Sequence, residues 1–222
     1  MNAKFLLFSG LATVLALQLC PKAAGQITTT ASVSPDAVIL DDDLNGLSSS
    51  ITMSSAINSI TSVQVSVDVV GAPYAFNGDY YAYLQYSSGL VVLLNNLGGS
   101  GGNPYGSPGD GFNVTFSDSA PNISTAPEVP LQPLTGTYAP QEGSLSSFDG
   151  LNPDGTWTLF IADEQAGGVG ELESWSLDVT GNPLSAPGVP DNTSTLELLV
   201  LGASSLALLS LRQRRLVNQK AG

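Results

Sequence analysis

The sequence of 222 residues contains no histidine, and this absence narrows its chemistry more than any other feature. Without imidazole there is no Ser-His-Asp or Cys-His catalytic arrangement and no zinc site built on histidine ligands. Cys20 is the single cysteine, and it precedes the position where we expect the chain to be cleaved. We therefore expect a mature chain without thiol or disulfide, stabilised by packing, hydrogen bonds or bound ions.

Basic residues are missing from the whole middle of the chain. Of the 19 acids, only Asp191 and Glu197 lie beyond residue 188, which leaves 17 acids and no lysine or arginine between residues 26 and 188. Such a segment repels nucleic acid and anionic membranes, so we expect no nucleic-acid partner. It attracts divalent cations, although solubility in a saline medium explains the same composition equally well. The six basic residues are terminal: Lys4, Lys22, Arg212, Arg214, Arg215 and Lys220.

The N-terminus has the pattern of an export signal. An apolar run from Phe5 to Leu19 follows Lys4, and the small residues Ala23, Ala24 and Gly25 come next. A charged start, a short apolar stretch and small residues before a polar one are typical of a secretory signal peptide. We predict a signal helix in residues 1–25, removed by signal peptidase.

Period-two alternation of apolar and polar residues recurs through the middle of the chain and predicts β-strands. Residues 63–69 show it most clearly, since every second residue is valine, and 112–116, 157–161 and 175–179 alternate likewise. Residues 89–96 are apolar on both faces, which predicts a central strand. Residues 97–111, rich in glycine, and 119–142, rich in proline, predict loops without a regular strand. Many short strands with long links favour an all-β antiparallel sandwich or jelly roll.

Aromatic residues offer two candidate surfaces. Trp157 and Trp175 are in phase with aliphatic residues on their strands, which predicts core packing rather than sugar stacking. The tyrosines of residues 80–86 fall on both faces of one strand, so some of them should be exposed and line a binding surface: Tyr80, Tyr81, Tyr83 and Tyr86.

Acids at predicted strand ends are candidate calcium ligands. Asp118 ends one strand, Asp154 lies in a turn, and Asp163 and Glu164 follow another strand. Calcium requires several converging hard oxygens, which these four side chains would supply if the fold brings them together. The alternative is that they are solvated acids. Asp41, Asp42 and Asp43 form a second cluster, and paired carboxylates would also serve glycoside hydrolysis, although nothing in the sequence marks out a pair.

The C-terminus carries an apolar segment followed by positive charge. Residues 196–211 are apolar apart from Glu197 and small hydroxyl residues, and Arg212, Arg214 and Arg215 follow directly. At about 1.5 Å per residue, this helix would span roughly 24 Å, slightly less than a hydrocarbon core of about 30 Å. The positive-inside rule then places the preceding domain outside the cell.

This tail resembles an exosortase-type sorting signal, a Val-Pro-Asp relative of bacterial PEP-C-terminal signals. The parts occur in the family's order: the motif Val189-Pro190-Asp191, one span, and an arginine cluster. Asn192 and Thr193 depart from the small residues usual after the Asp. The resemblance implies an exosortase-type processing enzyme as partner, cleavage near the motif, and delivery of the domain to the cell surface or extracellular matrix.

Residues 51–180 resemble the P domain, or Homo B domain, of subtilisin-like proprotein convertases. The resemblance rests on the alternating valine strand followed by Gly78-Asp79, on "FNVTFSDSA", and on residues 145–179, where Trp157, Asp163 and Trp175 keep the family spacing. Members of this family usually carry a histidine upstream of the position of Gly78. This sequence lacks it and has Ala72 or Pro73 near that place. The resemblance implies a jelly roll of about eight strands that often binds calcium and stabilises or regulates an adjoining protease domain, which we do not expect in this sequence.

The expected organisation follows from these segments. We predict a signal peptide (1–25), an N-terminal extension (26–50), the sandwich (51–180), a linker (181–188), the sorting signal (189–215) with its span (196–211), and a cytoplasmic tail (216–222). The leading hypothesis is a non-catalytic exported module that binds an extracellular protein or glycan, with calcium as its possible ion. The alternatives are a regulatory partner of a separate subtilisin-like protease and a glycan-active enzyme that uses carboxylates alone.

Overall fold

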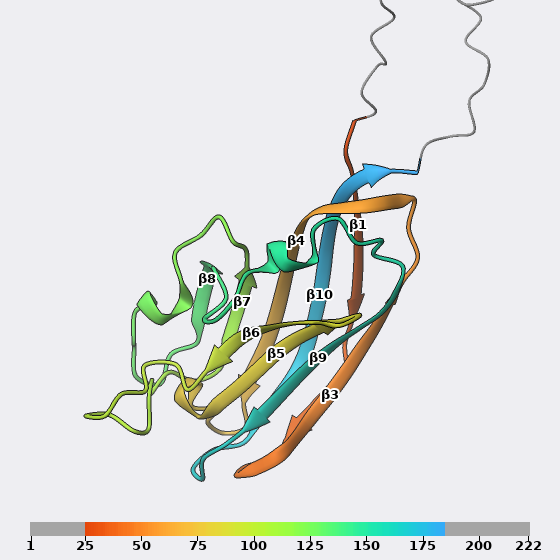
Figure 1. The fold of residues 1–222 in the computed structure, drawn as a ribbon. Coiled ribbons are helices and arrows are strands. Elements are labelled where there is room, and N and C mark those ends of the chain that lie inside the picture. The colour runs from red at the N-terminus through yellow and green to blue at the C-terminus, as the bar shows by residue number, and fades with distance from the viewer. Residues whose placement is uncertain (1–24, 185–222) are drawn as a thin grey trace, which may run out of the picture.

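The computed structural model describes residues 25–184, and this part of the chain is all β, with three short 3-10 turns (Figure 1). No helix in this described range is long and apolar enough to cross a membrane. The predicted signal peptide up to residue 24, the sorting motif and the predicted span lie outside the described residues. The strands are β1 (Ile27–Val33), β2 (Ala37–Ile39), β3 (Asp43–Met53), β4 (Ile57–Gly71), β5 (Tyr80–Tyr86), β6 (Gly89–Asn95), β7 (Phe112–Phe116), β8 (Leu134–Tyr138), β9 (Gly155–Asp163) and β10 (Gly170–Pro183).

The strands form two sheets that face each other (Figure 1). One sheet has the order β1-β10-β4-β7-β8, with β2 also paired to β10, and the other has the order β3-β9-β5-β6. Most neighbours are antiparallel, but β7 and β8 are parallel. The prediction of an all-β fold is confirmed, and the parallel β7–β8 pair departs from the purely antiparallel sheet that we expected.

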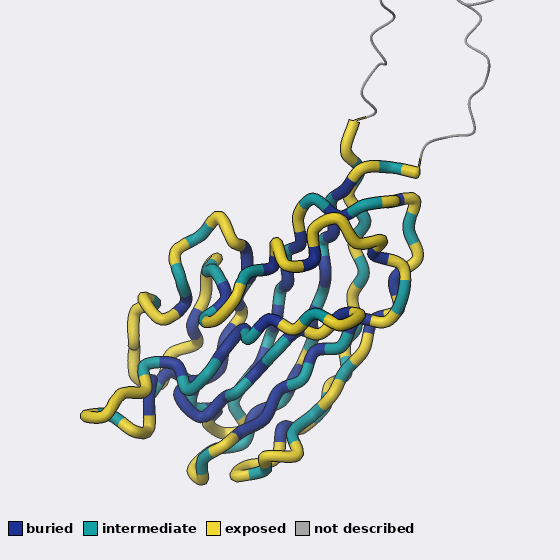
Figure 2. Tube along the Cα trace, viewed as in Figure 1, coloured by how far each residue is buried: buried dark blue, intermediate teal, exposed yellow. Residues whose placement is uncertain are grey.

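The core lies between the sheets and is built by the alternation seen in the sequence (Figure 2). Val63, Val65, Val67 and Val69 on β4 are all buried, while the polar residues between them face outward. Trp157 and Trp175 are 0% and 1% exposed, so their predicted core role is confirmed. Each indole N–H finds an acceptor, the Pro153 carbonyl at 3.0 Å for Trp157 and the Ser49 hydroxyl at 2.8 Å for Trp175, as burial of a polar group requires.

The sandwich extends beyond its expected limits at the N-terminal side. β1, β2 and most of β3 lie in residues 26–50, the segment that we expected to be an extension. β1 pairs with β10 from Ile27↔Gly181 to Val33↔Trp175, and β3 pairs with β9. The inward positions of residues 27–33 are Ile27, Thr29, Ala31 and Val33, so only the two ends of the strand are strongly apolar and the alternation is weak.

Two further predictions about strands were wrong. β8 lies inside residues 119–142, because Leu134 to Tyr138 pair with β7 and form the edge of the sheet despite the prolines around them. β6 was predicted to be central but lies at the edge of its sheet. β6 carries a β-bulge opposite Ala82 and Tyr83 of β5, where Leu93 is the extra residue, and both Leu93 and Leu94 are buried. Residues 97–111 contain no strand, as predicted.

The two ends of the sandwich differ in what they carry. Gly25 and Leu184, where the described chain begins and ends, lie at one end, beside the paired ends of β1 and β10 (Figure 1). At the opposite end β9 finishes at Asp163, β4 finishes at Gly71, and the 3-10 turn η1 (Asn77–Asp79) leads into β5. This second end collects the acids and buried polar groups described next.

Candidate functional site

Three aspartates from different segments lie near the end of the sandwich where β9 finishes, close enough for their charges to interact. Asp163 is the last residue of β9 and lies opposite Tyr80 on β5. Asp79 comes from η1, and its carbonyl accepts a hydrogen bond of 2.7 Å from the backbone N–H of Glu164. Asp41, in the turn before β3, accepts a hydrogen bond of 2.9 Å from the Gly167 N–H and so holds the loop after β9. The sheet register thus brings segments far apart in sequence to one point.

Asp163 is the central side chain of this acidic end. It is 0% exposed, and its Oδ1 accepts a hydrogen bond of 3.2 Å from the Gln165 N–H. Its Oδ2 is buried and has no hydrogen-bond partner within residues 25–184. The hydroxyl of neighbouring Tyr80 is also buried and, in the same described part of the chain, equally unpartnered. Buried polar atoms usually find partners, so two adjacent exceptions single out this position.

The electrostatics of the acidic end favour protonation or a bound cation. Burial raises the pKa of Asp163 to about 7, and the negative charges of Asp79, Asp41 and Asp42 add to the rise. Burial and the charge of Asp41 raise the pKa of Asp79 to about 6. Burial, followed by the charges of Asp163 and Asp79, raises the pKa of Tyr80. No lysine or arginine occurs between residues 26 and 188 to offset these charges.

The four acids predicted as calcium ligands do not converge. Asp154 precedes β9 and Asp163 ends it, so the nine residues of the strand separate them by about 30 Å at 3.3 Å per residue. Asp118 lies after β7 near Val63, also away from Asp163. Glu164 follows Asp163 but is exposed. Within residues 25–184 no three Asp, Glu, Cys or His side chains are placed to hold a metal ion, and calcium binding stays a prediction.

Asp118 and Asp154 bind backbone groups instead. Asp118 accepts hydrogen bonds from the Ser144 hydroxyl at 2.6 Å, the Leu145 N–H at 2.9 Å and the Ser146 N–H at 2.7 Å. Partial burial opposes ionisation, but these hydrogen bonds outweigh it and lower the pKa of Asp118. Asp154 accepts from the N–H and hydroxyl of Ser55 at 2.7 and 3.0 Å. Both carboxylates therefore fix loops to the sandwich.

The tyrosines of β5 divide between core and surface. Tyr80 and Tyr86 are buried, and Tyr86 stacks on Trp157 with a centroid distance of 4.0 Å. Tyr81 and Tyr83 point outward and are half-buried. Tyr83 stacks on Phe160 with centroids 4.8 Å apart, so these two ring faces cover each other. This arrangement leaves less open ring face for a ligand than the sequence predicted.

Comparison with known proteins gives one family match. Residues 132–179 match the proprotein convertase P-domain. The matched stretch runs from the loop before β8 almost to the end of β10, and it includes Asp163, Trp157 and Trp175. The P-domain is a non-catalytic part of proprotein convertases. Asp79 lies outside the match, and sequence reasoning noted the Gly78-Asp79 pair without assigning it to a site.

Two solved structures are similar to this chain. They are the serine protease of Aeromonas sobria in complex with a chaperone, at a TM-score of 0.47, and the same serine protease alone, at 0.44. Each is 17% identical and covers 73% of this chain. The match spans 28% of the length of each of those chains. A search of curated proteins found no match.

Proposed function

We propose that this chain is an exported, non-catalytic P-domain module that binds a protein partner, with a subtilisin-like serine endopeptidase as the first candidate. The P-domain match over residues 132–179 carries the proposal, because this segment supplies an inner strand of each sheet, β10 and β9, and the buried Asp163. The lack of histidine throughout the sequence removes the usual base of a serine or cysteine hydrolase. A jelly-roll topology is part of this proposal.

Calcium is the ion we propose for the acidic end. The orphaned Oδ2 of Asp163 and the neighbouring carboxylate of Asp79 are hard oxygen donors, which calcium prefers. Because only two such groups come from buried side chains here, backbone carbonyls and water would complete the ligand set, as in many calcium sites. A cation would also relieve the repulsion among Asp41, Asp79 and Asp163. Ligands that bind only the folded state raise its unfolding temperature, which provides the readout.

Export and surface sorting complete the proposal. A signal peptide over residues 1–25 would direct secretion, and the motif Val189-Pro190-Asp191 would be processed by an exosortase-type enzyme. The described chain leaves the sandwich at one end, through Gly25 and Leu184 (Figure 1). A tail that holds the domain at a surface would therefore present the acidic end away from the attachment point. This orientation supports a role for the acidic end in partner binding.

A carboxylate-based glycan hydrolase is less well supported. Asp79 and Asp163 are the pair with the most strongly raised pKa values, as a general acid requires. Asp163, however, is 0% exposed, so a glycan does not reach its carboxylate. The pair therefore fits ion binding better than catalysis.

The partner proposal is tested with full-length protein in mild detergent and a subtilisin-like protease secreted by the same source. The chain alone should hydrolyse neither a peptide panel nor a glycan panel. Added to the protease, it should bind in a surface-plasmon assay and change the protease's thermal stability or its kcat/KM on a fluorogenic peptide. Turnover of a glycan that is lost in a Glu or Asp variant, or no interaction with the protease, would contradict the proposal.

A further inference from the structure

The outer face of the sheet β3-β9-β5-β6 carries a strip of aromatic rings. Directly paired residues point to the same side of a sheet, so the register places Val92, Tyr83 and Phe160 in one row across β6, β5 and β9. Tyr81 lies beside this row on β5. The Tyr83 ring stacks on Phe160 with centroids 4.8 Å apart and meets the Tyr81 ring edge-on at 6.1 Å. All three rings are half-buried and lie outside the core.

Two of these rings already have a structural role. Phe160 covers Gly46 on the edge strand β3, where an added Cβ would lie 2.6 Å from the ring, and Tyr83 in turn covers Phe160. An aromatic ring laid over a glycine of an edge strand helps to fix the strand in register. Within residues 25–184, the Tyr81 ring stacks face to face on no other ring. Tyr81 is therefore the ring of the strip that is open to a ligand.

Two carboxylates border the Tyr81 ring. Asn95 lies directly opposite Tyr81 on β6, and its Nδ2 donates to Glu142 Oε1 at 2.7 Å, which holds Glu142 on this face. Glu164 follows the end of β9, the strand that pairs with β5 on the other side of Tyr81. Burial raises the pKa of Tyr81, and the charges of Glu142 and Glu164 add to the rise, which agrees with their position near its hydroxyl.

The charge at this surface favours a cationic partner. Glu142 and Glu164 are both exposed, and no lysine or arginine occurs between residues 26 and 188 to neutralise them. A negative surface attracts positive groups and repels nucleic acid and anionic lipid. A partner that docks on the Tyr81 ring is therefore expected to bring a positive charge with it.

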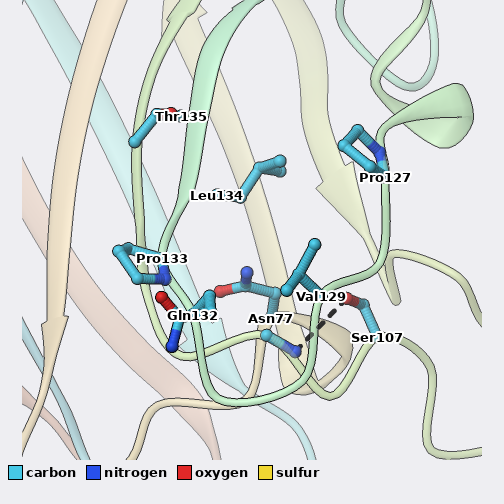
Figure 3. A pocket seen from close by; sticks show the side chains of 9 residues that line it. Asn77, Ser107, Pro127, Val129, Gln132, Pro133, Leu134 and Thr135 are labelled. Atoms are coloured by element: carbon cyan, nitrogen blue, oxygen red, sulfur yellow. Dashed lines mark hydrogen bonds between the residues drawn. The ribbon is translucent and has the colours of Figure 1, made fainter.

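The hollow near β8 lacks this combination of groups. A cavity of about 290 Å³ between η1 and the loop that leads into β8 is lined by side chains that include Asn77, Val129 and Leu134 (Figure 3). In the described part of the chain, no carboxylate is among its lining residues. Charge therefore directs a cationic group to Tyr81 rather than to this cavity.

We propose that the surface formed by Tyr81, Glu142 and Glu164 binds an arginine side chain of a partner protein. A guanidinium is planar, stacks on aromatic rings and pairs with carboxylates, so it uses both kinds of group found here. A lysine ammonium is a compact, strongly hydrated charge that would use the carboxylates but gain less from the ring. The inference rests on the proposed function as a binding module and names the chemistry that its partner presents.

The test titrates the full-length chain in mild detergent with N-acetyl-arginine methylamide and follows the tyrosine ring signals by carbon-13 NMR. EDTA is present throughout, because calcium would otherwise compete near Glu164. The Tyr81 signals are assigned by their loss in Tyr81→Phe and should move most. The citrulline derivative, which has nearly the same shape without the charge, should bind about fivefold more weakly, and the lysine derivative about threefold.

Variants locate the site. Tyr81→Leu, Glu142→Gln and Glu164→Gln should each weaken saturation transfer to the arginine side chain about two- to fivefold. Tyr81→Phe keeps the ring and should keep most of the signal. Glu173→Gln is the matched control, because Glu173 is an exposed acid on β10 of the other sheet. If Tyr81→Leu does not fold, the two glutamate variants decide the question.

The outcomes separate this inference from the proposed function. Equal binding of the arginine and citrulline derivatives, or a loss in Glu173→Gln as large as that in Glu142→Gln, would overturn the arginine site. A chain that binds the protease but not the arginine probe overturns this inference alone. A chain that binds the probe at Tyr81, yet binds no protease, supports the site and overturns the proposed protease partner.

Discussion

At the scale of single residues, the acidic end is distinguished by buried polar atoms that lack hydrogen-bond partners within residues 25–184. Tyr80 shows this clearly, because its hydroxyl is buried against Gly170 and has no hydrogen-bond partner within the described part of the chain. A Cβ at position 170 would overlap the Tyr80 hydroxyl oxygen. The glycine is therefore required by close approach rather than by backbone conformation.

Because Gly170 and the Tyr80 hydroxyl are in contact, removing that hydroxyl should restore stability that a larger residue at position 170 takes away. Gly170→Ala should lower the free energy of unfolding by about 1–3 kcal/mol, the usual cost of overpacking. Tyr80→Phe removes the unpartnered hydroxyl and should be neutral or slightly stabilising. The double variant should regain at least half of the loss. Urea denaturation of the four proteins measures these values, and strictly additive effects would show that the two residues do not interact.

Asp163 predicts how stability depends on pH. Because its folded pKa, about 7, lies above the ordinary value near 3.9, the folded state binds the proton more tightly. The contribution of Asp163 to stability is then present below pH 4 and is lost as the pH rises towards 7. Without divalent cations, Asp163→Asn should flatten this decline by roughly 2–4 kcal/mol. Denaturant melts in EDTA at pH 4 to 8 measure it, and parallel curves for wild type and variant would contradict the assignment.

At the scale of elements, the 3-10 turn η3 (Leu145–Phe148) depends on a capping carboxylate from another segment. Asp118 accepts from the two backbone N–H groups that begin this turn. Phe148, at its end, is buried and meets Trp157 edge-on with a centroid distance of 5.1 Å. The cap therefore holds part of the aromatic core in place.

Removing this cap has a predictable cost. Asp118→Ala should lower the free energy of unfolding by about 1 kcal/mol at pH 7. The loss should shrink as the pH falls through the lowered pKa of Asp118, because the wild-type carboxylate is then protonated. Asp149→Ala, at an exposed neighbouring acid, is the control and should change little. Equal losses in both variants at pH 7 would refute the capping role.

The sequence predicted the elements that show strong alternation and missed those formed through pairing. β4, β7, β9 and β10 follow from valine, leucine and aromatic residues at every second position. β1 and β8 have weak patterns of their own and form because β10 and β7 offer them free edges. The bulge on β6, where both Leu93 and Leu94 are buried, also depends on the partner strand. The place of a strand within a sheet depends on tertiary contacts, and the local alternation of apolar and polar residues does not predict it.

The candidate site was predicted only in part, for a similar reason. Asp163 was chosen because it ends a strand, and it does lie at the acidic end. Asp118 and Asp154 also follow or precede strands, yet they lie away from Asp163 and bind loops. Asp79 was missed, because a short turn before β5 carries no signal of burial. The Gly78-Asp79 pair, which was noted only for its resemblance, was the signal available.

At the scale of the whole molecule, charge of one sign dominates. Between residues 26 and 188 there are 17 acids and no basic residue, so every interaction between charged side chains in the sandwich is repulsive. Salt shortens the reach of this repulsion to roughly 8 Å at physiological ionic strength. The unfolding temperature of the full-length chain should therefore rise by several degrees between 10 mM and 500 mM NaCl. A calorimetric scan at constant pH measures it, and a flat or falling curve would contradict the account.

The acidic end around Asp79 and Asp163 is the cation-binding site that we propose for this chain. Equilibrium dialysis of the full-length chain against calcium at 150 mM KCl tests it most directly. We predict one calcium ion bound with a dissociation constant of about 10⁻⁴ to 10⁻³ M, typical of extracellular modules. Binding should be lost in Asp163→Asn and in Asp79→Asn but retained in Asp149→Asn, at an exposed acid away from this end. Calcium binding that is equal in all four proteins, or no binding up to 10 mM, would contradict the account.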